Sequence, residues 1–273
     1  MKYFAAIVAG LVTLLGFSSF CPAQTDVNLI DTPTASVLNK NSYNLNFRFY
    51  QEGGVLVQGT AGLTEKLTVG ASYGGVGIVG TGPIKSNPEP AFSLKYKLGE
   101  EGENLPFALS VGFDGQGYGK YYKEGEKIKW EGYEVTLKES FYQINSKGFY
   151  LALTKNLKDM NLLVTGGINH SLEENPGKVG ISFFTGAKFE VTPKLIFALE
   201  YNNGFHKEVK PEDVFKESVS VKKPFRKAGG EINLGIKVRY SPSLILEIDF
   251  KDLSGRYTDN GNRTFQIIYS GEF

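Results

Sequence analysis

Apolar and polar residues alternate one by one along about twelve stretches of this chain, which limits it to a β-sheet protein. The stretches cover residues 43–50, 55–62, 67–73, 91–98, 106–113, 148–156, 160–168, 179–190, 195–201, 228–240, 244–253 and 263–273. Side chains of a β-strand point alternately to its two faces, so each stretch is typical of a strand with one apolar face and one polar face. The pattern predicts an all-β fold that closes into a barrel or pairs as a sandwich.

The connections between these stretches alternate in length. Short connections cover residues 63–66, 99–105, 157–159, 191–194 and 241–243, and long ones cover residues 74–90, 114–147, 169–178, 202–227 and 254–262. Only the first outer connection, residues 51–54, is short where a long one is expected. Short periplasmic turns and long outer loops are typical of outer-membrane barrels. We therefore expect an up-and-down antiparallel transmembrane β-barrel of about twelve strands over residues 43–273.

Aromatic residues gather near the two ends of the predicted strands, with aliphatic residues between them. Near the periplasmic ends lie Tyr43, Phe107, Phe189, Tyr240 and Phe273, and near the outer ends lie Phe49, Tyr73, Phe92, Phe113, Phe149, Tyr201, Phe250 and Phe265. Aromatic girdles at both membrane interfaces are typical of transmembrane barrels. This placement predicts outer-membrane lipid around the apolar face.

The opposite face of the strands is rich in charge. We predict that it lines the lumen with Arg48, Lys95, Lys97, Lys188, Glu190, Glu200, Lys237, Arg239, Glu247, Asp249 and Lys251. Charges at this density cannot be buried in an apolar medium, so they face either a polar lumen or bulk water. Bulk water would mean a soluble periplasmic β-sandwich or β-barrel binding protein, which is kept as an alternative.

The start of the chain has the layout of a secretory signal peptide. Lys2 precedes an apolar run over residues 4–17 and a polar end, with cleavage expected after Ala23, so that residues 1–23 are removed. Cys21 is the only cysteine; a lipid anchor on it is an alternative, although bulky Phe20 precedes it. Residues 24–42 show no period and are predicted to be a leader segment tucked into or across the barrel mouth. The protein is thus expected in the bacterial outer membrane.

The last strand, residues 263–273, ends on an aromatic carboxyl-terminal residue. It resembles the closing strand of bacterial outer-membrane barrels, which implies that Tyr269, Gly271 and Phe273 form a signal for the barrel-insertion machinery. The alternative is an ordinary amphipathic strand that happens to end in Phe. Ile268 is the one residue that breaks its alternation.

Four short segments resemble the YjbH-like group of bacterial outer-membrane proteins. They are residues 30–35 (IDTPTA), 48–54 (RFYQEGG), 70–75 (GASYGG) and 112–118 (GFDGQGY), all within the first half of the mature chain. The resemblance implies an outer-membrane barrel, which in longer members is associated with exopolysaccharide production or export. It brings no catalytic residues, and this chain is much shorter than those members.

No catalytic, cofactor-binding or metal-binding residues are predicted. The two histidines, His170 and His206, fall in outer loops, and His170 and Ser171 would point to opposite faces of a strand. Residues 172–175 and 257–262 can hold a calcium ion but are more simply solvated turns. The near balance of 30 basic and 29 acidic residues argues against nucleic-acid binding.

Two loops offer further hypotheses. The glycine-rich residues 74–82 can either bend at the barrel rim or fold inward as a constriction. The loop over residues 114–147 holds Trp130, Tyr133 and five other aromatic residues, which can contact an envelope glycan or pack on one another. We favour packing.

Function follows from the predicted lumen. Its opposite charges can bridge much of the interior, so a narrow or gated passage or export component is predicted rather than a general porin. The YjbH-like resemblance implies a link to polysaccharide. The alternative is a non-conducting structural or assembly barrel.

Overall fold

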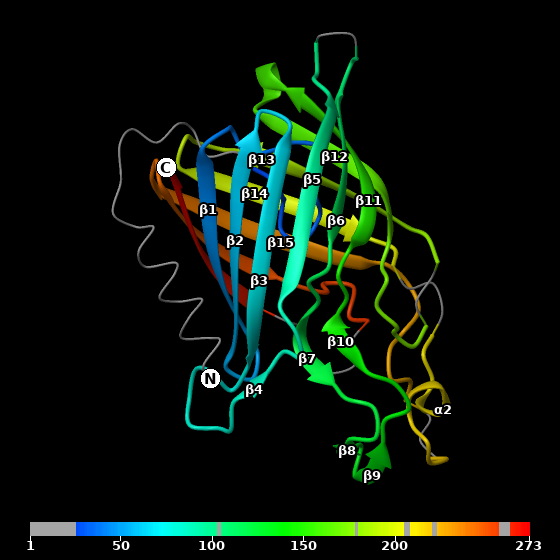
Figure 1. Ribbon diagram of the computed structural model, residues 1–273. Helices are drawn as coiled ribbons and strands as arrows, with labels where there is room; N and C mark the ends of the chain where they lie inside the picture. Colours follow the sequence, from blue (N-terminus) through cyan, green and yellow to red (C-terminus); the bar gives the residue numbers. More distant parts are fainter. Residues whose placement is uncertain (1–25, 103–104, 178–179, 205–207, 220–222, 257–262) are drawn as a thin grey trace.

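Twelve long strands close into one antiparallel ring in the computed structural model, which describes residues 26–102, 105–177, 180–204, 208–219, 223–256 and 263–273 (Figure 1). The ring strands are β1 (Ser42–Tyr50), β2 (Gly54–Thr64), β3 (Leu67–Val76), β5 (Ala91–Gly99), β6 (Ala108–Asp114), β11 (Gly148–Leu157), β12 (Leu162–His170), β13 (Ser182–Glu190), β14 (Leu195–Asn202), β15 (Glu231–Ser241), β16 (Leu244–Phe250) and β17 (Arg263–Glu272). Each pairs with its neighbours along the chain, and β17 returns to β1. The predicted up-and-down barrel is confirmed.

The outside of the ring is apolar. Phe92 is 68% exposed and Tyr240 is 72% exposed, and the outward positions between the two ends include Leu94, Leu153 and Leu199. In water such a surface would be unfavourable, whereas a bilayer covers it and the closed ring leaves no backbone edge unpaired in lipid. The protein is a bacterial outer-membrane barrel, and the soluble sandwich alternative is wrong.

The barrel closes on aromatic contacts at both ends of the β1 and β17 pair. Tyr43 lies opposite Gly271 and its ring stacks on Phe273 at 6.3 Å between centroids. At the other end, Phe49 and Phe265 pair at 6.1 Å. Ile268, which breaks the alternation of β17, lines a cavity of the lumen. The role of Tyr269, Gly271 and Phe273 as an insertion signal stays a prediction.

The outer connections carry secondary structure that the sequence did not predict, gathered at the lower end of Figure 1. These elements are β4 (Lys85–Ser86), β7 (Tyr118–Tyr122), β8 (Lys127–Trp130), β9 (Tyr133–Thr136), β10 (Phe141–Ile144) and α2 (Pro211–Val214). A 3-10 turn, η2 (Lys158–Met160), lies at the other end of the barrel. An apolar cluster joins two of the outer loops, since Trp130 of one packs on Phe215 of the other at 5.3 Å. Within the loop over residues 114–147, Tyr121 packs on Tyr142 and Tyr122 on Phe141, each at 4.9 Å between ring centroids, as favoured from the sequence, whereas Tyr133 is 46% exposed.

The glycine-rich loop after β3 does not enter the lumen. Val79 is 57% exposed and Ile84 is 59% exposed, and residues 79–84 lie on the surface throughout. The alternative of an inward constriction at residues 74–82 is therefore wrong. The physical reason is that residues 26–41 already fill the lumen.

Candidate functional site: the hairpin inside the lumen

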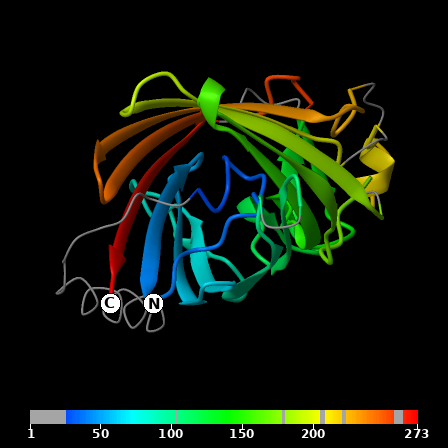
Figure 2. The same cartoon turned by 90° about the horizontal axis from the view of Figure 1, so that it is seen from above.

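Residues 26–41 form a hairpin inside the barrel, visible as the blue trace within the ring in Figure 2. Its turn is closed by the Leu29 amide on the Thr32 carbonyl at 2.9 Å and the Thr34 amide on the Val27 carbonyl at 3.0 Å. One arm runs into β1 at the periplasmic end, where the Asn41 amide donates to the Gly62 carbonyl at 2.9 Å. Both arms therefore point toward the periplasm, and the turn points outward.

The tip of the hairpin is held by the carboxylate of Asp31. Arg48 donates to Asp31 Oδ1 at 2.7 Å, Tyr118 donates to Oδ2 at 2.6 Å, and Lys251 forms an ion pair with the same oxygen. The Arg48 guanidinium also lies 4.5 Å from the Tyr118 ring centre. Tyr118 belongs to β7 of an outer loop. The hairpin, the barrel wall and an outer loop thus meet at one residue.

A second carboxylate, Glu200 of β14, receives the backbone of the tip. One oxygen accepts hydrogen bonds from the backbone amides of Ile30, Asp31 and Thr32 at 3.3, 3.0 and 2.8 Å. The other oxygen accepts a hydrogen bond from the side-chain amide of Asn233 at 2.8 Å. Hydrogen bonds from backbone N–H groups to a carboxylate are stronger than those to a neutral acceptor. Glu200 therefore satisfies backbone donors that would otherwise be unpaired in the turn.

The arms are held by side chains of the wall. Lys95 bridges both arms, donating to the Val27 carbonyl at 2.6 Å and the Thr34 carbonyl at 3.0 Å. The Ala35 amide donates to Thr154 Oγ1 at 2.8 Å, and the Leu38 amide donates to Thr68 Oγ1 at 2.8 Å. These contacts fix the hairpin without adding it to the sheet.

Two glycines make room for the tip. A Cβ atom on Gly186 would lie 2.5 Å from the Leu29 side chain, and one on Gly235 would lie 2.9 Å from the Ile30 side chain. Leu29 and Ile30 are consequently almost fully buried against the wall.

The residues predicted to line the lumen stand as follows. Arg48, Lys95, Lys188, Glu200, Lys237, Glu247, Asp249 and Lys251 are buried, whereas Lys97, Glu190 and Arg239 are half-buried. Six of the buried residues contact the hairpin directly. Arg48, Lys95, Glu200 and Lys251 are described above; in addition, Lys188 pairs with Asp26 and Lys237 donates to the Leu29 carbonyl. Lys237 also pairs with Glu247 at 3.1 Å, and Asp249 accepts from Thr264 at 2.6 Å. Sequence reasoning missed Asp31, Tyr118, Glu231 and Asn233.

Two small polar cavities flank the hairpin. The outer cavity, of about 80 Å³, reaches Tyr118 and the outer strand ends, and the inner one, of about 100 Å³, reaches Lys95 and Lys237. Residues that line both are Asn28, Ile30, Asn46, Arg48, Gln58 and Asp114. Each is large enough for several water molecules. Asn28 and Ile30 of the hairpin therefore lie at the boundary between two polar spaces within one lumen.

The histidines and the calcium candidates do not form a reactive site among the described residues. His170 ends β12 and contacts the Gly180 carbonyl, while Ser171 lies 3.4 Å from Ser146. His206 and residues 257–262 lie outside the described residues. The solvated-turn interpretation of residues 172–175 holds only in part, because Glu173 is half-buried and accepts from the Ser146 amide at 3.2 Å.

Burial raises the pKa of Glu173 to about 7. Its carboxyl binds a proton more readily in the folded loop than in the free chain, so the folded loop loses stability as the pH rises from about 4.5 to about 7. We expect the amide of Ser146 to exchange faster in the wild type than in Glu173→Gln at pH 8, and at similar rates at pH 5. The measurement is the rate of hydrogen exchange at the Ser146 amide in both proteins at each pH. The ratio of the two rates removes the intrinsic dependence of amide exchange on pH. A ratio of rates that is the same at both pH values would contradict this prediction.

No protein-family model and no curated protein matches the chain. Among solved structures, the fold is similar to the KdgM porin, at 6% identity over 85% of this chain and 99% of that chain, with a TM-score of 0.45. It is also similar to the outer membrane protein Omp33 of Acinetobacter baumannii (10% identity, 85% and 97% covered, TM-score 0.40) and to the CymD monoaromatic hydrocarbon channel (11% identity, 86% and 89% covered, TM-score 0.42). The YjbH-like resemblance stays a prediction.

Proposed function

We propose that this barrel is a narrow, gated passage for polar solutes and that residues 26–41 are its gate. The observation that carries the proposal is that Asn28 and Ile30 of the hairpin line both of two adjacent polar cavities of the lumen. A solute that enters the outer cavity meets Asn28, Ile30 and Asp31 of the hairpin before it reaches the inner one. Movement of the tip would join the two spaces.

The way the hairpin is bound supports a gate rather than a permanent part of the wall. Its backbone donors inside the lumen go to side chains such as Glu200, Thr154 and Thr68, so undocking breaks no strand ladder. The freed groups face a polar lumen in which water can replace the hairpin. The closed ring stays intact in either position.

The polysaccharide role and the glycan partner have less support than the gated passage. A role in polysaccharide export is supported by the YjbH-like resemblance alone, and an envelope glycan as partner is disfavoured by Trp130, which is 7% exposed and belongs to the apolar cluster of the outer loops. The alternative function is a non-conducting structural or assembly barrel, favoured by the number of buried contacts that hold the hairpin. Measurements of the ionic current through the barrel in planar bilayers distinguish the two functions.

Locking the hairpin is expected to abolish conduction. The Ala35 amide lies 2.8 Å from Thr154 Oγ1, so Ala35→Cys with Thr154→Cys places two thiols close together. The predicted cleavage after Ala23 would remove Cys21 from the mature chain. In planar bilayers, we expect brief openings of the reduced double variant to disappear on oxidation and to return with reductant.

The two single variants are the controls, because neither can form the bond. Equal currents from the oxidised and reduced double variant, with the disulfide verified by mass spectrometry, would rule out gating by this hairpin.

A further inference from the structure

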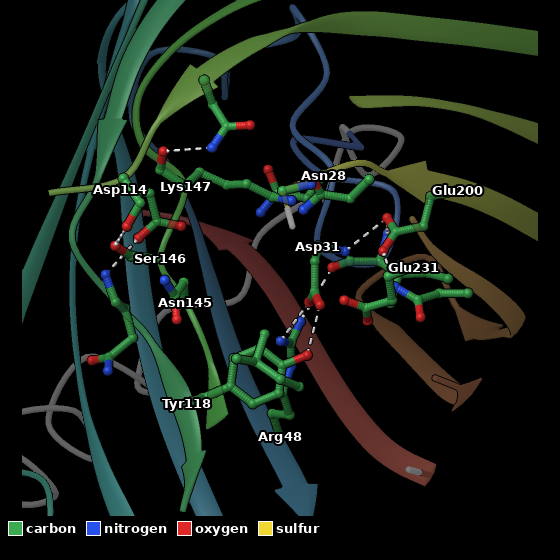
Figure 3. A pocket seen from close by; sticks show the side chains of 18 of the residues that line it. Asn28, Asp31, Arg48, Asp114, Tyr118, Asn145, Ser146, Lys147, Glu200 and Glu231 are labelled. Carbon is green, nitrogen blue, oxygen red and sulfur yellow. Dashed lines mark hydrogen bonds and ion pairs between the residues drawn. The ribbon is translucent and has the colours of Figure 1, made fainter. Parts of the chain in front are cut away.

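Tyr118 joins an outer loop to the tip of the hairpin. It lies in β7, is 5% exposed, and donates from its hydroxyl to Asp31 Oδ2 at 2.6 Å (Figure 3). Its ring is held as well, because the Arg48 guanidinium lies 4.5 Å from the ring centre and the Tyr50 ring packs against it at 5.9 Å between centroids. Asp31 can therefore keep this hydrogen bond only while β7 stays against the barrel wall.

The strand β7 is half of a short two-stranded ribbon that leads into the outer loops. It pairs with β10 so that Tyr118 lies opposite Ile144 and Tyr122 lies opposite Phe141 (Figure 1). At the barrel end, Tyr118 and Ile144 pack with Leu56 of β2. At the outer end, Phe141 belongs to the apolar cluster of the outer loops, and Tyr122 packs against that cluster. This β7–β10 ribbon, about 13 Å long from Tyr118 to Tyr122, thus contacts both the hairpin and the cluster.

The apolar cluster fixes the outer end of the ribbon to the loop over residues 202–227. Phe141 of β10 packs edge-on against Phe225 of that loop, at 6.1 Å between ring centroids. Thr136 of β9 donates from its hydroxyl to Glu217 at 2.7 Å. The position of the ribbon therefore depends on burial in the cluster, whose fully buried side chains include Val135, Leu137, Val209 and Val214.

We propose that the apolar cluster of the outer loops helps to hold the hairpin in the lumen through the β7–β10 ribbon, so that opening the cluster weakens docking of the hairpin. The two sites are coupled because one hydrogen-bonded ribbon contacts both. As control of a passage this rests on the proposed function, since an event at the outer surface would then open the lumen. Docking of the hairpin itself can be measured without conduction.

Charges placed in the apolar cluster test the coupling. Leu137→Asp and, in the other loop, Val214→Asp each put a charge among buried apolar side chains, which opens the cluster. Emission at longer wavelengths from Trp130, the only tryptophan of the chain, verifies the opening. Leu172→Asp is the matched control, because Leu172 is 55% exposed and lies outside the cluster.

The readout is the thiol introduced by Ala35→Cys. Ala35 is fully buried in the docked hairpin, so a maleimide labels this thiol when the hairpin undocks. We expect labelling at least about fivefold faster in both cluster variants and unchanged labelling in Leu172→Asp. Migration on unboiled and boiled gels verifies that each barrel is folded. Folded variants with an open cluster that label as slowly as their parent would overturn the proposal.

Tyr118→Phe tests whether the ribbon carries the coupling. This substitution removes the hydrogen bond to Asp31 and keeps the ring, while the backbone hydrogen bonds to Glu200 still hold the tip. Leu137→Asp should therefore speed labelling by a smaller factor in Tyr118→Phe than in its parent. The same factor in both backgrounds would overturn the role of the ribbon.

The rate of labelling does not depend on conduction, so the two proposals can fail separately. A barrel in which opening the cluster speeds labelling but which never conducts would contradict the passage alone. A conducting barrel whose labelling is unaffected by opening the cluster would contradict the coupling alone.

Discussion

Deleting residues 26–38 is expected to turn the barrel into a steadily open channel, with a conductance about tenfold or more above that of the wild type. The deletion removes the hairpin and leaves Asn39, whose carbonyl accepts the Ser42 amide at the start of β1. The polar wall that held the hairpin, including Lys95, Glu200 and Thr154, then faces water along the height of the lumen. Single-channel recording in planar bilayers measures the change.

A deletion of residues 80–83 is the matched control, because these residues lie exposed in the loop after β3. It should leave the current unchanged. If the barrel without the hairpin stays silent although it migrates as a folded barrel on unboiled gels, the lumen does not conduct and the structural or assembly alternative is favoured.

Replacing Asp31 by Asn is expected to weaken docking of the hairpin by about 3–5 kcal/mol, because Arg48 and Lys251 lose the charge that pairs with them. Asn keeps the size of the side chain but not its charge. The undocked population should rise by about 150-fold to about 5,000-fold. A thiol at Ala35, which is fully buried in the docked hairpin, reports this population through its rate of labelling by a maleimide.

Asp26→Asn is the control for this substitution. Asp26 pairs with Lys188, but Lys188 also pairs with Glu190 at 2.9 Å, so the cation keeps a partner when Asp26 is neutralised. We expect about 1 kcal/mol or less for this change. Equal labelling rates for the Asp31→Asn variant and its parent would show that the Asp31 contacts do not hold the hairpin.

The predicted leader shows how far the sequence could be read at the candidate site. The lumen prediction contained seven basic and four acidic side chains, so three positive charges were left over. Two acidic residues of the leader supply part of the missing negative charge. Asp26 pairs with Lys188, and Asp31 pairs with both Arg48 and Lys251. The imbalance was a usable signal that acidic residues from outside the strands enter the lumen. It did not say which loop or terminus supplies them.

The twelve strands could be recognised because the sequence of each strand alternates between apolar residues that face lipid and polar residues that face the lumen. Lipid on one side and a wet lumen on the other impose a period of two, and a run such as β5 shows it within nine residues, from Ala91 to Gly99. Local alternation and loop length were therefore enough for strand count, closure and membrane location.

The sequence of the hairpin has no such periodic pattern. Its residues 26–41 bind side chains far away in the chain, as in the contact of Asp31 with Lys251, 220 residues later, or of Thr32 with Glu200, 168 residues later. An irregular segment satisfied by side chains needs no periodicity, so its amino acids do not reveal that it folds inward. The position of the hairpin in the lumen and the contact of Asp31 with Tyr118 arise only once the ring has closed and brought distant strands around one enclosed space.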